Sequence, residues 1–153
     1  MCWTSDILKG LPAGVVALIV AAISWRQYLV AKAKLKLDLF ERRYAIFQQT
    51  WEILSEVVSH GTREKAYGLA TPFNNFLPQA RFLLGKKIAA YLDIASSNWA
   101  ELHGLEGERT DIAGADLQNN IARTTELKGW FFKEASEGCK QQFDEYLDFE
   151  RWK

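Results

Sequence analysis

The N-terminal part of the chain carries an apolar run that polar side chains do not interrupt. Residues 11–25 read LPAGVVALIVAAISW, fifteen positions without a charge. This run is shorter than the roughly 20 apolar residues that a membrane-spanning helix needs. Counting from Ile7 to Ala31 gives enough length if Lys9 and Arg26 extend their long side chains back to the lipid headgroups. The pattern therefore predicts a membrane-spanning helix near the N-terminus.

Aromatic residues stand at both ends of this segment. Trp3 and Trp25 are 22 residues apart, which corresponds to roughly 33 Å along a helix at about 1.5 Å per residue. That length is close to the ~30 Å thickness of the hydrocarbon core of a bilayer. Trp and Tyr prefer the borders of this core, and Tyr28 lies near the second border. We therefore predict that residues 1–31 form an anchor in a lipid bilayer.

Two other interpretations of the apolar run stay open. A cleaved signal peptide needs small residues at a cleavage site, and residues 21–25, AAISW, offer weak candidates before a basic flank. A buried core helix is compatible with a run this short. A helix lying flat in the membrane interface is disfavoured, because residues 15–23 are apolar on every side.

Charges beside the run predict its orientation. One side carries only Asp6 and Lys9, and the other side has no acidic residue before Asp38. The basic residues on that second side are Arg26, Lys32, Lys34 and Lys36. Basic residues favour the cytoplasmic side, so we expect the N-terminus outside the inner (cytoplasmic) membrane and residues 32–153 in the cytoplasm. Each cation near the surface also gains about 1 kcal/mol from anionic lipid headgroups.

Small residues recur along the predicted anchor. They are Gly10, Gly14, Ala17 and Ala21, and the two glycines form a G-x-x-x-G pair. Small side chains let two membrane helices approach closely, so these residues are a candidate surface for self-association. The alternative is that Gly and Ala are simply common in membrane-spanning helices.

Apolar positions after the anchor follow a helical period. Between residues 35 and 58 they fill about half of the helical circle, and polar side chains fill the rest. We expect this helix to continue from the anchor as one rod and to end near His60 and Gly61, because Gly suits a helix C-terminus. No alternating strand pattern of useful length follows.

Further helices are expected along the rest of the chain. The predicted order is kinked helical pieces over 62–85 around Pro72 and Pro78, a helix over 86–103, a polar loop over 104–111, a helix over 113–137, a break at Gly138 and a last helix over 139–152. The predicted fold class is therefore all-α. An N-terminal transmembrane helix (1–31) continues into an antiparallel cytoplasmic bundle of four or five helices (32–153).

One basic residue falls in the middle of the apolar face of the 35–58 helix. Arg43 shares that face with Leu39 and Phe47, and a buried guanidinium without an acidic or carbonyl partner is costly. We interpret Arg43 as half of an internal ion pair with an acid of another helix, such as Glu145 or Asp148. The alternative is a contact with another subunit or with a ligand.

Composition narrows the classes of function. The chain has 153 residues with 19 basic and 19 acidic groups, and a net charge of zero gives no electrostatic footprint for nucleic acid. Two Cys and two His predict neither a disulfide framework nor a zinc site. His60 and His103 fall at predicted helix ends, where a cation favours the helix dipole. No catalytic set or phosphate-binding loop is recognisable, so the sequence predicts no enzymatic activity, no cofactor and no metal.

The stretch directly after the anchor has a distinctive sequence. Residues 34–44, KLKLDLFERRY, resemble a widespread group of small bacterial membrane proteins with one N-terminal helix, a basic flank and a KLxLDLFxRRF start to a cytoplasmic helical domain. Residues 82–92 (FLLGKKIAAYL) and 143–149 (FDEYLDF) look similar to the same group. That group is mostly without assigned function, so the resemblance implies an architecture only. A looser similarity is to single-pass accessory membrane proteins of CRISPR loci, whose helical domains assemble into membrane pores.

Three functional hypotheses follow from these patterns. The first is a bacterial inner-membrane protein whose cytoplasmic bundle self-associates into a homo-oligomer, acting as a pore-like effector at the membrane. The second is an adaptor that tethers a different cytoplasmic protein. The third is an enzyme of unrecognised type, which a deep polar pocket containing His60 or Arg43 would favour.

Overall fold

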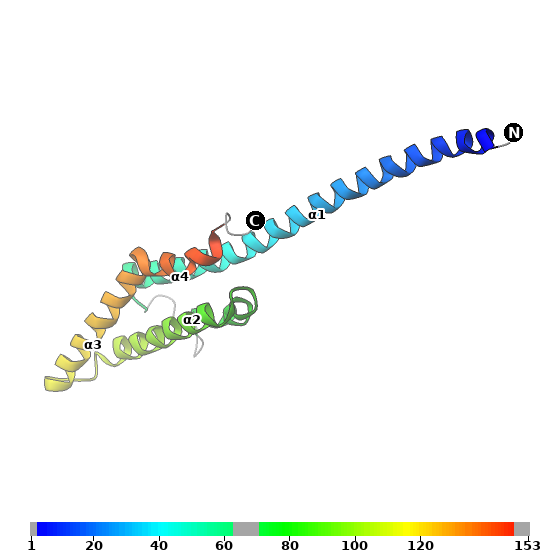
Figure 1. Ribbon diagram of the computed structural model, residues 1–153. Helices are drawn as coiled ribbons and strands as arrows, with labels where there is room; N and C mark the ends of the chain where they lie inside the picture. Colours follow the sequence, from blue (N-terminus) through cyan, green and yellow to red (C-terminus); the bar gives the residue numbers. More distant parts are fainter. Residues whose placement is uncertain (1–2, 63–70, 149–153) are drawn as a thin grey trace. The chain divides into compact units, whose positions relative to one another are not determined.

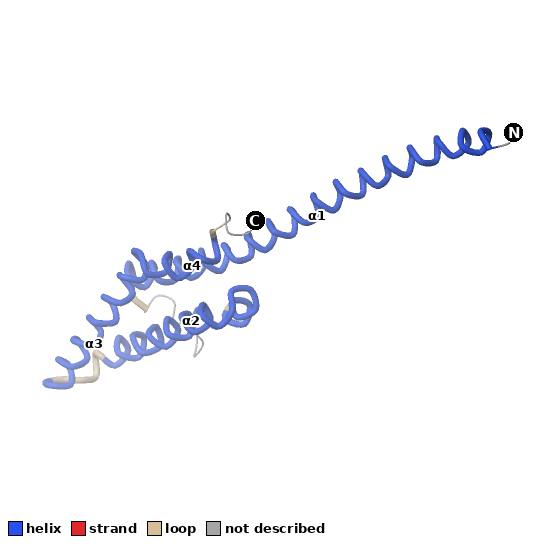
Figure 2. The backbone as a smooth tube through the Cα atoms, viewed as in Figure 1, coloured by secondary structure: helices blue, strands red, loops and turns tan. Residues whose placement is uncertain are grey.

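The structure, a computed structural model, describes the backbone of residues 3–62 and 71–148, with side chains described from Gly14 onward. This part of the chain contains helices and no β-strand (Figure 2). The predicted all-α class is therefore confirmed for these residues. The chain divides into two compact units, unit 1 (Met1–Leu39) and unit 2 (Phe40–Lys153). This division follows packing within the chain, whereas the boundary predicted after residue 31 concerns a bilayer and stays a prediction.

The longest element is α1 (Trp3–His60), a single α-helix. It provides the described residues of unit 1 and the first element of unit 2. Its C-terminal end confirms the prediction that this helix ends near His60 and Gly61. Gly61 has a φ of 73°, and its N–H donates a hydrogen bond to the carbonyl of Val57 at 2.9 Å. Glycine adopts this left-handed conformation without the steric cost of a Cβ atom, so the helix stops there.

In unit 1, every side chain from Gly14 to Leu35 is exposed. By length and composition, the N-terminal helix is long and apolar enough to cross a membrane, and it is the one described helix that is. None of its most apolar stretch is buried. That finding disfavours the alternative of a core helix within this chain, because the described residues provide no core around it.

Unit 2 contains three long helical segments. The first is the second half of α1, and the second is α2 (Leu77–Glu108), which the short 3₁₀ helix η1 (Pro72–Asn75) precedes. The third is nearly continuous, because α3 (Gly114–Lys133), the π-helical turn η2 (Glu134–Gly138) and α4 (Cys139–Leu147) follow one another without a loop. The described residues therefore form three segments where four or five helices were expected.

Helices α1 and α2 run in the same direction in unit 2, and the third segment runs back against both (Figure 1). The ring of Phe143 in α4 contacts Phe47 in α1 and Tyr91 in α2, at centroid distances of 5.5 and 6.4 Å. Further along both helices, Glu106 of α2 meets Thr62, just after α1. The prediction of an antiparallel bundle is therefore wrong for α1 and α2.

The connection between α1 and α2 explains this parallel pair. Residues 61–76 span at most about 55 Å when extended. The helical stretch from Phe47 to His60 measures only roughly 20 Å. The chain is thus long enough to return along unit 2 before α2 begins. Short loops favour antiparallel neighbours, and this connection is not short.

The kinked helical pieces predicted over residues 62–85 are confirmed from residue 71 onward. Residues 63–70 lie outside the described part. Pro72 and Pro78 fall in the first turns of η1 and α2, where a missing N–H leaves no helical hydrogen bond unmade. Gly85 has non-helical angles, φ 79° and ψ −172°, and kinks α2. Its left-handed φ is one that side chains with a Cβ rarely adopt.

The loop expected over 104–111 is wrong in its first half, because α2 continues to Glu108. Trp99, Leu102 and Glu106 are buried at helical spacing. Their packing keeps this turn helical although it contains two glycines, which cost roughly 1 kcal/mol each in a helix interior. Tertiary burial therefore outweighs local propensity here.

The break expected at Gly138 is also wrong. Gly138 has helical angles, φ −60° and ψ −47°, so the preceding helix leads directly through the π-helical turn into α4. A Cβ atom at this position would collide with the carboxylate of Glu134. The glycine therefore provides space rather than a turn. Helix α4 ends at Leu147, and residues 149–153, which were expected to extend it, lie outside the described part.

The core of unit 2 lies between its three segments. The largest fully buried apolar side chains are Ile46, Leu54, Phe73, Ile88, Leu92, Leu102, Phe131 and Phe143. Thr50 is buried in the same stripe of α1 and donates its hydroxyl to the carbonyl of Ile46 at 2.8 Å. Its polar group is thus satisfied by its own helix and needs no partner from another segment.

Candidate functional site

The aromatic pair predicted for the inner membrane border lies on the surface of unit 1. The rings of Trp25 and Tyr28 are one helical turn apart, with centroids 5.9 Å apart and planes tilted by 37°. Both rings are more than half exposed. A ring with an apolar body and a polar edge suits the border between hydrocarbon and headgroups. Trp3, predicted for the other border, belongs to α1, but its side chain lies outside the described residues.

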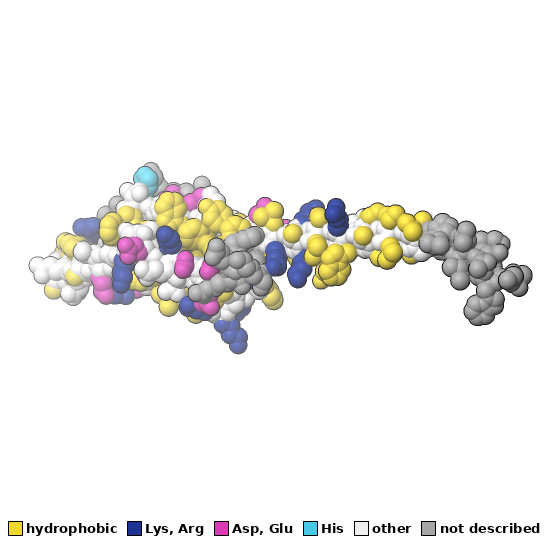
Figure 3. Space-filling model, turned by 45° about the horizontal axis from the view of Figure 1, so that its top comes forward, with side chains coloured by type: hydrophobic (Ala, Val, Ile, Leu, Met, Phe, Trp, Pro, Cys, Tyr) yellow, Lys and Arg dark blue, Asp and Glu magenta, His cyan; other side chains and the backbone are white. Residues whose placement is uncertain are grey.

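Basic side chains follow this pair along α1. Arg26, Lys32 and Lys34 are exposed, and Lys36 is half-buried. Figure 3 shows Lys and Arg side chains, in dark blue, on the part of the helix that follows the yellow apolar stretch. Charges placed in this way attract an anionic surface within a Debye length, about 8 Å at physiological ionic strength.

The predicted small-residue surface is uncovered in unit 1. Gly14, Ala17 and Ala21 are exposed, and a Cβ atom added to Gly14 would meet nothing within 4 Å. Packing within the described residues therefore does not require a glycine at this position. Gly10, the other half of the G-x-x-x-G pair, has a side-chain position outside the described residues.

Arg43 lies in α1 at the edge of the buried stripe of unit 2. Its side chain is half-buried, with a buried Nε atom, and it makes at least one interaction. Of the two acids predicted as partners, Glu145 lies 3.8 Å from the Nζ of Lys87, and Asp148 makes an interaction of its own. The ion pair between Arg43 and either acid stays a prediction, as does the subunit contact.

A buried polar cluster joins the ends of α1 and α2. The Oε2 atom of Glu106 accepts hydrogen bonds from the backbone N–H of Thr62 at 2.9 Å and from its hydroxyl at 2.6 Å. The Oε1 atom lies 2.7 Å from the Nζ of Lys128 in α3. Burial acts to raise the pKa of the Glu106 carboxyl, but the hydrogen bonds from Lys128 and Thr62 outweigh it, so the pKa is lowered. The carboxylate stays ionised at neutral pH and connects α1, α2 and α3.

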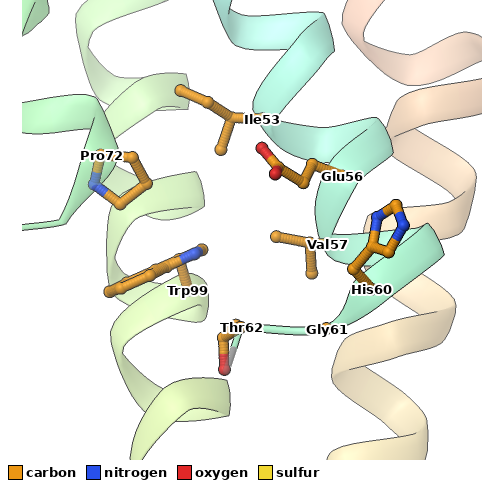
Figure 4. Close-up of a pocket in the computed structure, with 8 residues that line it drawn as sticks. All are labelled: Ile53, Glu56, Val57, His60, Gly61, Thr62, Pro72 and Trp99. Carbon is orange, nitrogen blue, oxygen red and sulfur yellow. The ribbon is translucent and has the colours of Figure 1, made fainter. Parts of the chain in front are cut away.

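A cavity of about 90 Å³ lies beside this cluster. In Figure 4, Ile53 and Val57 of α1 lie across it from Pro72 and Trp99. The remaining lining residues are Glu56, His60, Gly61 and Thr62. Pockets that hold organic ligands measure about 300–1,000 Å³, so this cavity has room for a few water molecules only. This cavity is too small for the pocket that the enzyme hypothesis requires. A wider and more open polar hollow of about 490 Å³ contains His60 and is lined further by Glu106, Arg109, Thr110 and Lys128, so that hypothesis stays untested.

The two histidines differ in their positions. His60 is the last residue of α1, as predicted, but His103 lies inside α2 and not at its end. The ring of His103 stacks on Trp99, with centroids 5.1 Å apart and planes at 14°. Within the described part of the chain, no group of three or more His, Cys, Asp or Glu side chains is placed to hold a metal ion.

A second polar group lies at the π-helical turn. The Tyr91 hydroxyl donates a hydrogen bond to the Oε2 atom of Glu134 at 3.0 Å. Burial raises the pKa of the nearby Cys139 thiol to about 12, so the thiol stays protonated and weakly nucleophilic at neutral pH. Trp51 of α1 donates its indole N–H to the Ala135 carbonyl at 3.0 Å. These contacts attach the turn to α1 and α2 and indicate a structural role.

No protein-family model, curated protein or solved structure matches this chain. The resemblance of residues 34–44 to small bacterial membrane proteins therefore stays a prediction from those residues. The function has to be inferred from the surfaces of the two units themselves.

Sequence reasoning missed the cluster of Thr62, Glu106 and Lys128. A signal for it was present, because Glu106 continues the helical spacing of Trp99 and Leu102, and an acid on an apolar stripe needs a partner. The π-helical turn left no comparable signal, since a glycine in a helical pattern more commonly marks an end or a break.

Proposed function

We propose that this chain is a single-pass bacterial inner-membrane protein whose C-terminal helical unit lies in the cytoplasm and assembles with further copies into a membrane-acting, pore-like effector. One observation carries the proposal: the side chains of α1 from Gly14 to Leu35 are exposed all round, and the first half of that stretch is apolar. Water-facing surfaces seldom keep an apolar area this large. A helix satisfies its own backbone hydrogen bonds, so hydrocarbon can surround it.

The proposed orientation rests on the basic side chains that follow the apolar stretch. Arg26, Lys32 and Lys34 are exposed there, which favours the cytoplasmic side for everything that follows. Protease treatment of spheroplasts tests this orientation. A tag at the C-terminus should survive until the membrane is opened, and a tag at the N-terminus should be lost at once.

Membrane fractionation tests the anchor. The full-length protein should sediment with membranes and resist extraction at high pH. A variant with Leu18→Lys and Ala22→Lys should be released, because each charge near the middle of a spanning helix costs about 2.5–3.5 kcal/mol. A matched variant, Ala33→Lys, should stay in the membrane. An unmodified protein that remains in the supernatant after ultracentrifugation would overturn the proposal.

Self-association is supported by the uncovered small residues of unit 1 and by exposed aromatic residues of unit 2. Chemical cross-linking in native membranes should capture homo-oligomers of defined size. A protein that is strictly monomeric under these conditions would contradict assembly, even if it fractionates with membranes.

A second candidate function is a membrane-tethered adaptor for a different cytoplasmic protein. It is favoured by Phe82, which is 89 % exposed, and by Phe132, which is 62 % exposed. Large aromatic side chains contribute strongly to protein contacts and gain nothing from exposure to water. Purification from membranes should then recover a second protein in fixed ratio, and Phe82→Ser should reduce its recovery.

A further inference from the structure

A line of large apolar side chains runs along α1 in unit 2 without entering the core. Tyr44 and Trp51 are each 46 % exposed, and Val58 is 40 % exposed. They follow one another at intervals of seven residues. On the same helix, Ile46 and Leu54 are buried in the core. The three exposed residues, called the heptad line below, therefore form a second apolar surface beside the core stripe.

The seven-residue interval distinguishes this surface from scattered exposed residues. On a straight α-helix, a strict interval of seven drifts by about 20° per repeat. The drift disappears when the helix winds around a second helix. The residues three positions further on, Phe47 and Leu54, pack within unit 2, so the heptad line itself supplies the contact with a second helix there. Lipid needs no such repeat, and the predicted anchor ends at residue 31, before the heptad line begins.

Charges beside this surface are complementary between two parallel copies. With Leu37 and Tyr44 at the first position of the heptad (a), Lys36 occupies position g and Glu41 occupies position e. In a parallel pair, the g residue of one helix faces the e residue of the following heptad in its partner. Lys36 of each copy then faces Glu41 of the other. An antiparallel pair would instead place each residue beside its own kind.

We propose that the heptad line is the surface to which a second copy of this chain binds, with the two α1 helices parallel and in register. The inference rests on the proposed function, because insertion into one membrane with one orientation makes the two helices parallel. Trp51 is held by its hydrogen bond to the Ala135 carbonyl. The exposed part of its ring is therefore already in place, which lowers the entropy cost of binding.

Disulfide cross-linking of the full-length protein in native membranes tests this surface. In a Cys2→Ser background, Tyr44→Cys is compared with Gln49→Cys, an exposed position of α1 away from the heptad line. Mild oxidation should give a dimer with Tyr44→Cys and several times less with Gln49→Cys. Val58→Cys provides a second position on the heptad line if the Tyr44 variant does not accumulate. Equal cross-linking at Tyr44 and Gln49 would overturn the proposal that the heptad line binds a second copy.

Charge reversal tests the parallel register. Lys36→Glu and Glu41→Lys each place like charges opposite one another in a homodimer, so each alone should weaken the dimer. The double variant Lys36→Glu/Glu41→Lys exchanges the two charges within one chain and restores both attractive pairs of a parallel dimer, so its dimer should exceed that of either single variant about fivefold. A double variant that dimerises no better than the two single variants would show that the register is wrong.

An amine-reactive cross-linker on the unmodified protein separates this inference from the proposed function. If the amine reagent captures oligomers but Tyr44→Cys and Val58→Cys do not cross-link, the heptad line is not the binding surface, although the chain still self-associates. A monomer with every reagent would overturn self-association, and the heptad line with it.

Discussion

Replacing Glu106 by Ala tests whether the buried carboxylate holds α1 and α2 together. The variant removes the acceptor of two hydrogen bonds from Thr62, whose backbone N–H and hydroxyl then lie buried without that partner, since Thr62 is only 2 % exposed. It also removes the partner of Lys128, whose side chain is half-exposed. Glu108→Ala is the matched control, because Glu108 is an exposed acid on the same helix.

The expected loss follows from the kinds of contact involved. A hydrogen bond to a charged group contributes about 1.5–3 kcal/mol, and an ion pair that is open to water contributes about 0–1 kcal/mol. Two bonds to the carboxylate and one screened ion pair together predict a loss of about 3–7 kcal/mol. That is a large share of the roughly 5–15 kcal/mol by which a domain is stable. The control should lose less than about 0.5 kcal/mol.

Urea unfolding of the detergent-purified protein measures this difference. Trp fluorescence is a suitable signal, because Trp99 is buried beside the cluster. With an m-value of about 1–3 kcal/mol per molar urea, the midpoint of Glu106→Ala should fall by at least about 1 M. Equal midpoints for Glu106→Ala and Glu108→Ala would refute the reasoning, because the buried carboxylate would then contribute no more than an exposed one.

The pH dependence gives a second readout of the same group. The folded-state pKa of Glu106 is lowered from its ordinary value of 4.5. Its contribution to stability is therefore present above pH 4.5 and is lost as the pH falls below that value. The unmodified protein should lose this part of its stability on acidification, and Glu106→Ala should not.

Two further predictions concern the π-helical turn and its surroundings. Gly129→Ala, which meets open space, should raise the stability of unit 2 by roughly 1 kcal/mol through helix propensity. Gly138→Ala should fall short of that gain by about 0.5–1.5 kcal/mol, because its new Cβ atom displaces the carboxylate of Glu134 from the hydrogen bond with Tyr91. Urea unfolding midpoints of the two variants measure this difference, and equal midpoints would contradict it. In a Cys2→Ser background, Cys139 should resist alkylation at pH 8 until the protein unfolds, because burial keeps its thiol protonated. Mass spectrometry before and after denaturation measures the alkylated fraction. Rapid labelling of the folded protein would contradict this prediction.

The sequence predicted the parts of the fold that depend on local pattern. The end of α1 was predictable because Gly61 follows a long helical period, and the prolines at 72 and 78 correctly indicated interruptions. The direction of α2 was not predictable, because it depends on how far residues 61–76 carry the chain. The helical continuation past His103 was missed because it depends on the burial of Leu102 and Glu106.

The candidate functional residues also differ in how far the sequence alone predicts them. The exposed stretch of α1 with Trp25 and Tyr28 was predictable, because its apolar composition and its bordering aromatic residues are visible in the sequence. The partner of Glu106 lies 44 residues away along the chain. A contact of that kind depends on tertiary structure, and no spacing within one segment specifies it.

The bond between Trp51 and the Ala135 carbonyl joins residues 84 positions apart. Helix α1 is therefore synthesised long before the segment that covers it. While the ribosome is still translating α2, Phe47 has no Phe143 to pack against, and the inner face of α1 is open to chaperones or to neighbouring nascent chains. Unit 2 can complete its folding only after the last helix has left the exit tunnel. A premature stop before α4 would thus leave an aggregation-prone product rather than a smaller working domain.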